Sequence, residues 1–166
     1  MTSNTKYHQE FLDQAILRLN ENLPRIKKCL DLLLEDQLWI KENPKSNSVA
    51  NIILHLCGNV RQYIMSSIDG QNDVRKRDKE FNTSGGRSGQ ELYKMLDQTM
   101  QEAIVVIGNC KEEDMLSQKK VQVYELSNVG IILHVTEHFS YHTGQIATMT
   151  KAILNKDLGF YKGVEL

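Results

Sequence analysis

Three of the five histidines in this sequence share one spacing within a single short segment. His134, His138 and His142 follow one another at intervals of four residues in the stretch ILHVTEHFSYHTGQI. Residues four apart lie on the same face of an α-helix, so these imidazoles would project together. Two histidines at that spacing can bind one zinc or similar ion through their ring nitrogens. The pattern therefore indicates a metal site on a helix, with His138 and His142 as ligands.

A third ligand is expected from His55, in the stretch NIILHLCGNVRQY. His55 lies among apolar residues and begins a polar stripe that continues with Asn59 and Gln62. Buried polar groups need partners, and helix bundles build metal sites from side chains on facing helices. We therefore expect His55, His138 and His142 to form a three-histidine site. The alternative is that His55 bonds a main-chain carbonyl while His138 lies on the helix surface.

A different zinc motif overlaps the same segment. HVTEH, from His134 to His138, matches the H-x-x-E-H pattern of inverted zinc peptidases, in which Glu137 would be the general base. Those enzymes need a further carboxylate ligand well downstream and a large mixed fold. Glu137 would also project about 100° away from His138 around the helix. We therefore reject this motif and expect His134 to pack beside the site.

The elements that must position these residues are helices. Apolar residues recur at helical spacing in four segments, 7–34, 48–67, 88–108 and 127–154. Asn47 or Ser48, the capping box at 88–91, and Ser127 provide their start signals. Pro24 is expected to kink or split the first helix. Between them lie a long polar connection, 69–88, and one short extended segment near 117–126. An all-α four-helix bundle is the architecture that this order predicts.

Size and charge narrow the class of protein further. The chain has 166 residues, which suits a single domain covering 1–166, and its formal net charge is −1. That charge gives no reason to expect nucleic acid or an anionic membrane as partner. The three cysteines are far apart and form no CxxC pair, and the first residues lack the apolar core of a signal peptide. We expect a cytoplasmic protein.

Two of these stretches resemble a known superfamily. SVANIILHLCGNVRQYI is similar to the second-helix segment of the DinB-like (DinB/YfiT) superfamily, and ILHVTEHFSYHTGQI to its fourth-helix signature. A subfamily of unassigned activity also carries a D-x-R-x-R-D-x-E-F segment, matched here by DVRKRDKEF, residues 73–81. The resemblance implies a four-helix bundle of the DinB/YfiT type and a divalent metal on His55, His138 and His142. It also implies thiol-dependent transferases among the relatives, and homodimers.

These observations lead to two functional expectations. The first is an enzyme, a thiol-dependent transferase or a hydrolase, in which zinc or nickel activates a thiol or water against a small-molecule substrate. Gln145 and Asn59 would then lie beside the ligands or line the substrate pocket, with His134. The second is a non-catalytic metal-binding bundle with a structural or stress-response interaction role. No side chain is assigned a catalytic role, and Arg61 is expected to pair with an acidic residue of the long connection.

Overall fold

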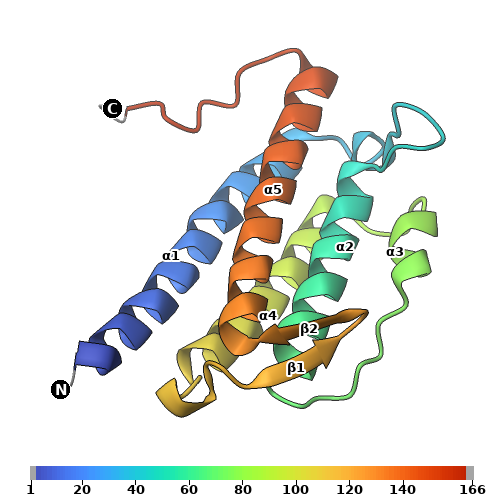
Figure 1. Cartoon of the computed structure of the whole chain (residues 1–166). Helices are drawn as coiled ribbons and strands as arrows, with labels where there is room; N and C mark the ends of the chain where they lie inside the picture. Colours follow the sequence, from blue (N-terminus) through green and yellow to red (C-terminus); the bar gives the residue numbers. More distant parts are fainter. Residues whose placement is uncertain (1–2, 164–166) are drawn as a thin grey trace.

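Four long helices form the body of the computed structural model, which describes residues 3–163 (Figure 1). Both ends of the expected 1–166 domain therefore lie outside the described residues. The long helices are α1 (Ser3–Leu32), α2 (Val49–Val60), α4 (Gly89–Gly108) and α5 (Asn128–Leu154). α1 packs against α4 and α5, and α2 packs against α4 and α5 from the other side. The predicted all-α four-helix bundle is confirmed.

The helix starts lie where the sequence signals place them. The Ser48 hydroxyl accepts a hydrogen bond from the main-chain N–H of Asn51, and Ser88 does the same for Glu91. Both pairs are reciprocal capping boxes, which satisfy main-chain N–H groups that have no partner within the helix. Ser127 likewise caps α5 through the N–H of Gly130. These caps fix where the site-bearing helices α2 and α5 begin.

The core is the apolar interior shared by these helices. Fully buried members include Leu19, Ile26, Leu56, Leu96 and Phe139, contributed by all four long helices. Each such side chain removed from water contributes about 1.5–3 kcal/mol before entropy is counted. This packing keeps α1 continuous through Pro24, so the expected split of that helix is not found.

The helical backbone extends beyond Val60, the residue at which the α-helical hydrogen bonding of α2 ends. It continues as a π-helical turn, Arg61–Ser66, in which the main-chain N–H of Ser67 donates to the carbonyl of Gln62. The predicted helix to about residue 67 is therefore confirmed in extent, with a change of helical type that the apolar spacing did not indicate. Wider turns of this kind re-aim side chains and recur at functional sites.

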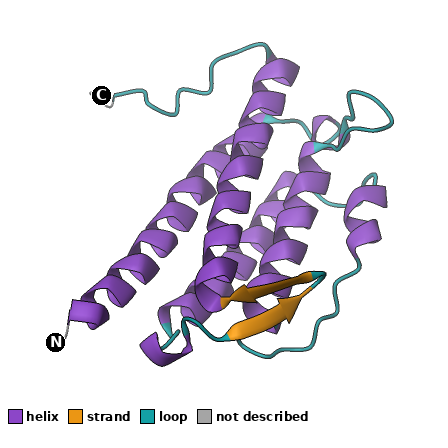
Figure 2. Ribbon diagram, viewed as in Figure 1, coloured by secondary structure: helices purple, strands orange, loops and turns teal. Residues whose placement is uncertain are grey.

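The connections contain more structure than the sequence suggested. A short helix, α3 (Arg77–Asn82), lies outside α2 within the long polar connection (Figure 1). The expected single extended segment is an antiparallel hairpin of β1 (Gln118–Val121) and β2 (Tyr124–Ser127), drawn in orange in Figure 2. Short 3-10 turns occur at Gln37–Trp39 and Glu112–Asp114. No helix among residues 3–163 has the length and apolar character needed to cross a bilayer.

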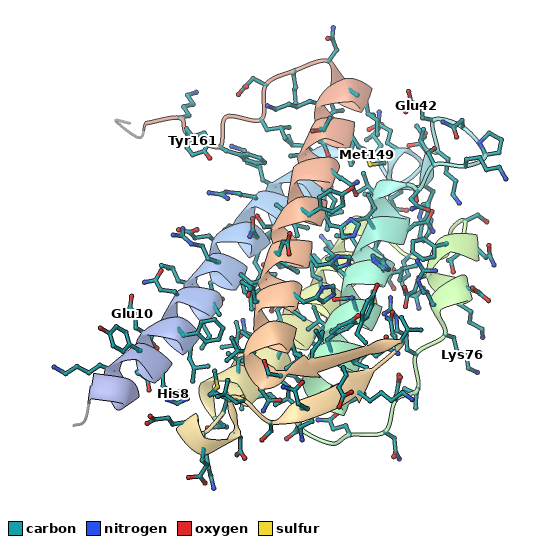
Figure 3. All side chains as sticks on the ribbon, viewed as in Figure 1. His8, Glu10, Glu42, Lys76, Met149 and Tyr161 are labelled. Carbon is teal, nitrogen blue, oxygen red and sulfur yellow. The ribbon has the colours of Figure 1, made fainter. Side chains whose placement is uncertain are left out.

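The described part of the C-terminal segment folds back toward α1. Leu158 is buried, and the ammonium of Lys28 donates a hydrogen bond to the carbonyl of Gly159 at 3.1 Å. Arg25 of α1 lies over the ring of Tyr161, which Figure 3 shows beside that helix. This segment lies on the α1 side of the bundle, at the end away from the hairpin.

Candidate metal centre

The predicted three histidines come together between α2 and α5. Each offers one ring nitrogen, and these three atoms lie within 4.8 Å of one another. Nε2 of His55 is 2.9 Å from Nε2 of His138, and the ring centroids of His138 and His142 are 4.4 Å apart. His55 is buried, whereas the two α5 histidines are half-buried. The cluster therefore has one deep histidine and two shallower ones, which is the geometry of a site reached from one side.

Hydrogen bonds determine which nitrogen of two of these rings faces inward. Nδ1 of His55 lies 3.0 Å from Oε2 of Glu80, and Nδ1 of His142 lies 2.8 Å from Oε1 of Gln145. Both oxygens can only accept, so the proton of each neutral ring lies on Nδ1. Each Nε2 then carries a free lone pair. This is the ligand tautomer found where a second group orients a metal-binding histidine.

The donor set fits a divalent cation. Nε2 of His55 carries a lone pair, and Nε2 of His138 lies 2.9 Å from it. Two ring nitrogens this close need either a proton on one of them or a cation between them. Burial, then the neighbouring charges of His142 and His55, lower the pKa of His138 to about 3, so its ring is neutral at neutral pH and can offer a lone pair to a cation. Burial also lowers the pKa of His142, against the hydrogen bond to Gln145. Neutral imidazoles converging on one point suit zinc, nickel and other first-row metals.

Glu80 and Arg75 belong to the site, although the sequence reasoning did not assign them to it. The guanidinium of Arg75 donates to both carboxylate oxygens of Glu80, from Nε at 2.7 Å and from Nη2 at 2.9 Å. Burial of the Glu80 carboxyl opposes its ionisation, but the hydrogen bonds from Arg75 and His55 outweigh it, so its pKa is lowered. The carboxylate is therefore charged where it meets His55. The only sequence signal was their place in the DVRKRDKEF segment.

Two expected neighbours of the ligands lie close by, and both carry an unsatisfied polar atom. Asn59 is buried, and within residues 3–163 its Oδ1 has no hydrogen-bond partner. His134 stacks between Tyr63, at 4.3 Å between centroids, and His138, at 5.4 Å. Its Nε2 is buried and, within the same described stretch, also lacks a partner. Their roles beside the ligands or in a substrate pocket stay predictions.

Two other residues of α2 and its π-turn point elsewhere. Cys57 is buried, burial raises the pKa of its thiol to about 12, and its Sγ is not among the ligand atoms that converge in the cluster. Arg61 pairs with Glu102 of α4 at 3.0 Å, and not with an acidic residue of the long connection as expected. Arg61 pairs with Glu102 because its side chain points toward α4 and not toward the long connection. Two acidic residues of the connection have other partners: Asp73 accepts a hydrogen bond from Gln62, and Glu80 pairs with Arg75.

The fold has solved counterparts. A DinB-like protein from Bacillus cereus superposes with a TM-score of 0.68 at 12% sequence identity, covering 85% of this chain and 91% of that one. A DinB-like protein, YjoA, from Bacillus subtilis superposes with the same TM-score and identity, covering 92% and 99%. At that identity the likeness establishes the fold alone. No curated protein matches the sequence.

Sequence comparison identifies the family more directly. The pattern described as "Protein of unknown function (DUF1572)" matches residues 6–161, which include both histidine segments and the DVRKRDKEF segment. The expected DinB-like fold is therefore confirmed, and the chain is a member of the DUF1572 family.

Proposed function

We propose that this protein is a divalent-metal-dependent enzyme, a thiol-dependent transferase or a hydrolase, with zinc or nickel held by His55, His138 and His142. The observation that carries the proposal is the convergence of three ring nitrogens within 4.8 Å, two of them aimed by Glu80 and Gln145. A divalent ion with three protein ligands keeps a position for a thiol or water and lowers its pKa.

The protein's own part in the reaction is to hold the metal ligands in place and to orient their rings. The deep ligand, His55, is fixed on one side by the Glu80 carboxylate and packs against the ring of Phe81, with centroids 5.0 Å apart. The shallower His142 is fixed by Gln145, whose Nε2 donates in turn to the hydroxyl of Tyr141 at 2.9 Å. Ligands locked in this way do not have to be reorganised when substrate binds.

A substrate pocket adjoins this arrangement at the end of the bundle away from the hairpin. A cavity of about 680 Å³ lies between α2, α5 and the preceding loop; its walls include Ile40, Ile52, Gln145, Met149 and Ile153. Figure 3 shows Glu42 and Met149 at this end, where the loop approaches α5. Gln145 is shared by the cavity and the histidine cluster, so a molecule in the cavity reaches the residue that orients His142. The lining suits a small substrate with an apolar body and a polar end.

The first test is the metal content of untagged protein, measured by plasma mass spectrometry after reconstitution with zinc or nickel. We expect about one equivalent per chain in the wild type and a loss in His55→Ala, His138→Ala and His142→Ala. His8→Ala is the matched control, because His8 lies on α1 at the opposite edge of the bundle (Figure 3) and contacts the Cys110 carbonyl. A wild type without metal would overturn the proposal.

The second test addresses catalysis. Loaded protein is screened with low-molecular-weight thiols against chromogenic electrophiles, and with chromogenic esters and amides in the absence of thiol. Turnover that requires the metal and disappears in His138→Ala would support an enzyme. Full metal loading without turnover in either screen would favour the non-catalytic metal-binding bundle. The homodimer and the cytoplasmic location expected from the sequence stay predictions.

A further inference from the structure

One short segment of the long connection makes three separate contacts with the deepest ligand. Residues 75–81 bring Glu80 to Nδ1 of His55, Phe81 to the face of its ring, and Arg75 to within 3.2 Å of the same Nδ1. Both Arg75 Nη2 and His55 Nδ1 donate to Oε2 of Glu80, which explains why these two nitrogens are neighbours. The segment therefore fixes the ring plane and the tautomer of His55 together.

The ion pair at the centre of this segment is almost completely buried. The side chains of Arg75 and Glu80 are only 4% and 9% exposed. Removing two charges from water costs several kcal/mol per ion, and hydrophobic residues of similar size often give equal or better stability. A buried pair of this kind is therefore weak evidence for a stabilising role. The contact with His55 provides another reason for its presence.

α2 leaves room for the carboxylate by lacking a side chain at one position. A Cβ atom placed on Gly58 would lie 2.0 Å from Oε1 of Glu80 and 2.8 Å from its Cδ. Gly58 lies inside α2, one turn after His55, where glycine is less favourable than alanine. Only glycine at this position lets Glu80 approach His55 over the helix surface.

The segment is also attached at its far end. The side-chain amide of Asn51, one turn before His55, donates to the carbonyls of Glu80 and Thr83, both at 2.8 Å. Nη1 of Arg75 donates to Gln62 in the π-helical turn, and Gln122 at the hairpin tip donates to the same Gln62 oxygen. The segment is thus connected to the helix on both sides of His55, through Asn51 before it and Gln62 after it.

We propose that Glu80, held by Arg75 and accommodated by Gly58, is the positioning residue that sets the metal affinity of His55, and that metal binding and docking of residues 75–83 on α2 are thermodynamically coupled. The inference rests on the proposed metal site. Coupling of this kind is reciprocal. Any change that stabilises the docked segment raises the metal affinity, and metal binding raises the equilibrium constant for docking by the same factor.

Two substitutions test the proposal in different ways. Gly58→Ala displaces Glu80 without changing any charge, and Gly108→Ala in α4 is its control, because a Cβ there meets only Ile16 at an ordinary 3.8 Å. Glu80→Gln keeps the size and an oxygen acceptor but removes the charge that Arg75 and His55 share. If Gly58→Ala does not fold, which circular dichroism would show, Glu80→Gln alone decides.

Three properties of the wild type and the variants are then measured: zinc affinity, the cobalt(II) spectrum and hydrogen exchange. Zinc affinity is measured by competition with a chelating dye, and we expect Kd to rise about 10–100-fold in Gly58→Ala and Glu80→Gln but not in Gly108→Ala. At saturating cobalt(II), the visible spectrum should change in Glu80→Gln, which a purely structural role would not produce. Hydrogen exchange in residues 75–83 should slow on adding zinc to the wild type, and much less in the two variants.

The outcomes separate this inference from the metal site itself. If the wild type binds no zinc, the proposed function fails first. If it binds zinc while Gly58→Ala and Glu80→Gln keep Kd within about twofold and an unchanged cobalt spectrum, Glu80 does not position His55. If zinc leaves exchange in residues 75–83 unchanged in the wild type, the coupling is absent.

Discussion

Oε1 of Gln145 lies 2.8 Å from Nδ1 of His142, three residues earlier on the same helix. A short-range contact inside one helix thus aims the inner nitrogen of His142, whereas His55 is aimed by a residue 25 positions away in sequence. The two ligands are oriented independently. A change at Gln145 can therefore be made without disturbing Glu80 or the segment that carries it.

Gln145→Ala should weaken zinc binding about 10-fold, because His142 loses the acceptor that fixes its tautomer. Gln145→Glu should bind zinc at least as tightly as the wild type, since a carboxylate accepts the same hydrogen bond more strongly. Dye competition gives both values, and Gln101→Ala on exposed α4 surface controls for the loss of an amide. Equal Kd for Gln145→Ala and wild type would show that this contact does not orient the ligand.

Metal binding should stabilise the fold, because the ligands come from α2 and α5 and converge only in the native state. At free zinc about 100 times Kd the gain is about 2.7 kcal/mol. For a chain of this size that corresponds to a rise in Tm of roughly 5–10 °C. Calorimetry with zinc and with excess chelator measures the shift. The same comparison on His142→Ala should show almost none; a shift of equal size there would place the ion elsewhere.

Asn51→Ala should destabilise the protein by about 2–3 kcal/mol, since the amide both completes the capping box with Ser48 and holds α3 through two carbonyls. Urea unfolding measures the loss of free energy. Asn72→Ala, at an exposed position of the long connection, should be nearly neutral. A loss below about 0.5 kcal/mol for Asn51→Ala would mean that α3 does not depend on this side chain.

The three cysteines should resist thiol reagents in the native protein. Cys29, Cys57 and Cys110 are all buried, and burial raises the pKa of each, that of Cys57 to about 12. The reactive thiolate is therefore scarcer in all three residues than in an exposed cysteine. Titration with a chromogenic disulfide should label no thiol in buffer and all three in denaturant. Rapid native labelling of Cys57 that zinc prevents would instead make it a ligand.

Regular periodicity predicted the helices and the convergence of three histidines. Both kinds of inference depend on the same fact, that spacing within an α-helix determines which side chains share a face. Serine caps then set the start of α2, α4 and α5 to within a residue. The expected pairing of His55 with His138 and His142 followed because helices with buried polar stripes must face one another.

The parts that were missed depend on contacts between segments distant in sequence. α3 has only six residues, and its position depends on Asn51 and on the contact between Glu80 and His55, not on an apolar stripe of its own. Gly58 carried no signal in the sequence, since its role is visible only when Glu80 lies over it. The predicted partner of Arg61 was wrong. The angular position of a residue around a helix gives the direction of its side chain, but it does not show which element lies in that direction.

His55 and His138 are 83 residues apart along the chain, and this separation has a consequence for biosynthesis. At about 5–20 residues per second, a ribosome needs roughly 4–17 s to reach His138 after it has added His55. During that interval the nascent chain contains His55 but neither α5 histidine. A metal held by all three histidines, as proposed, can therefore load only after α5 has been synthesised.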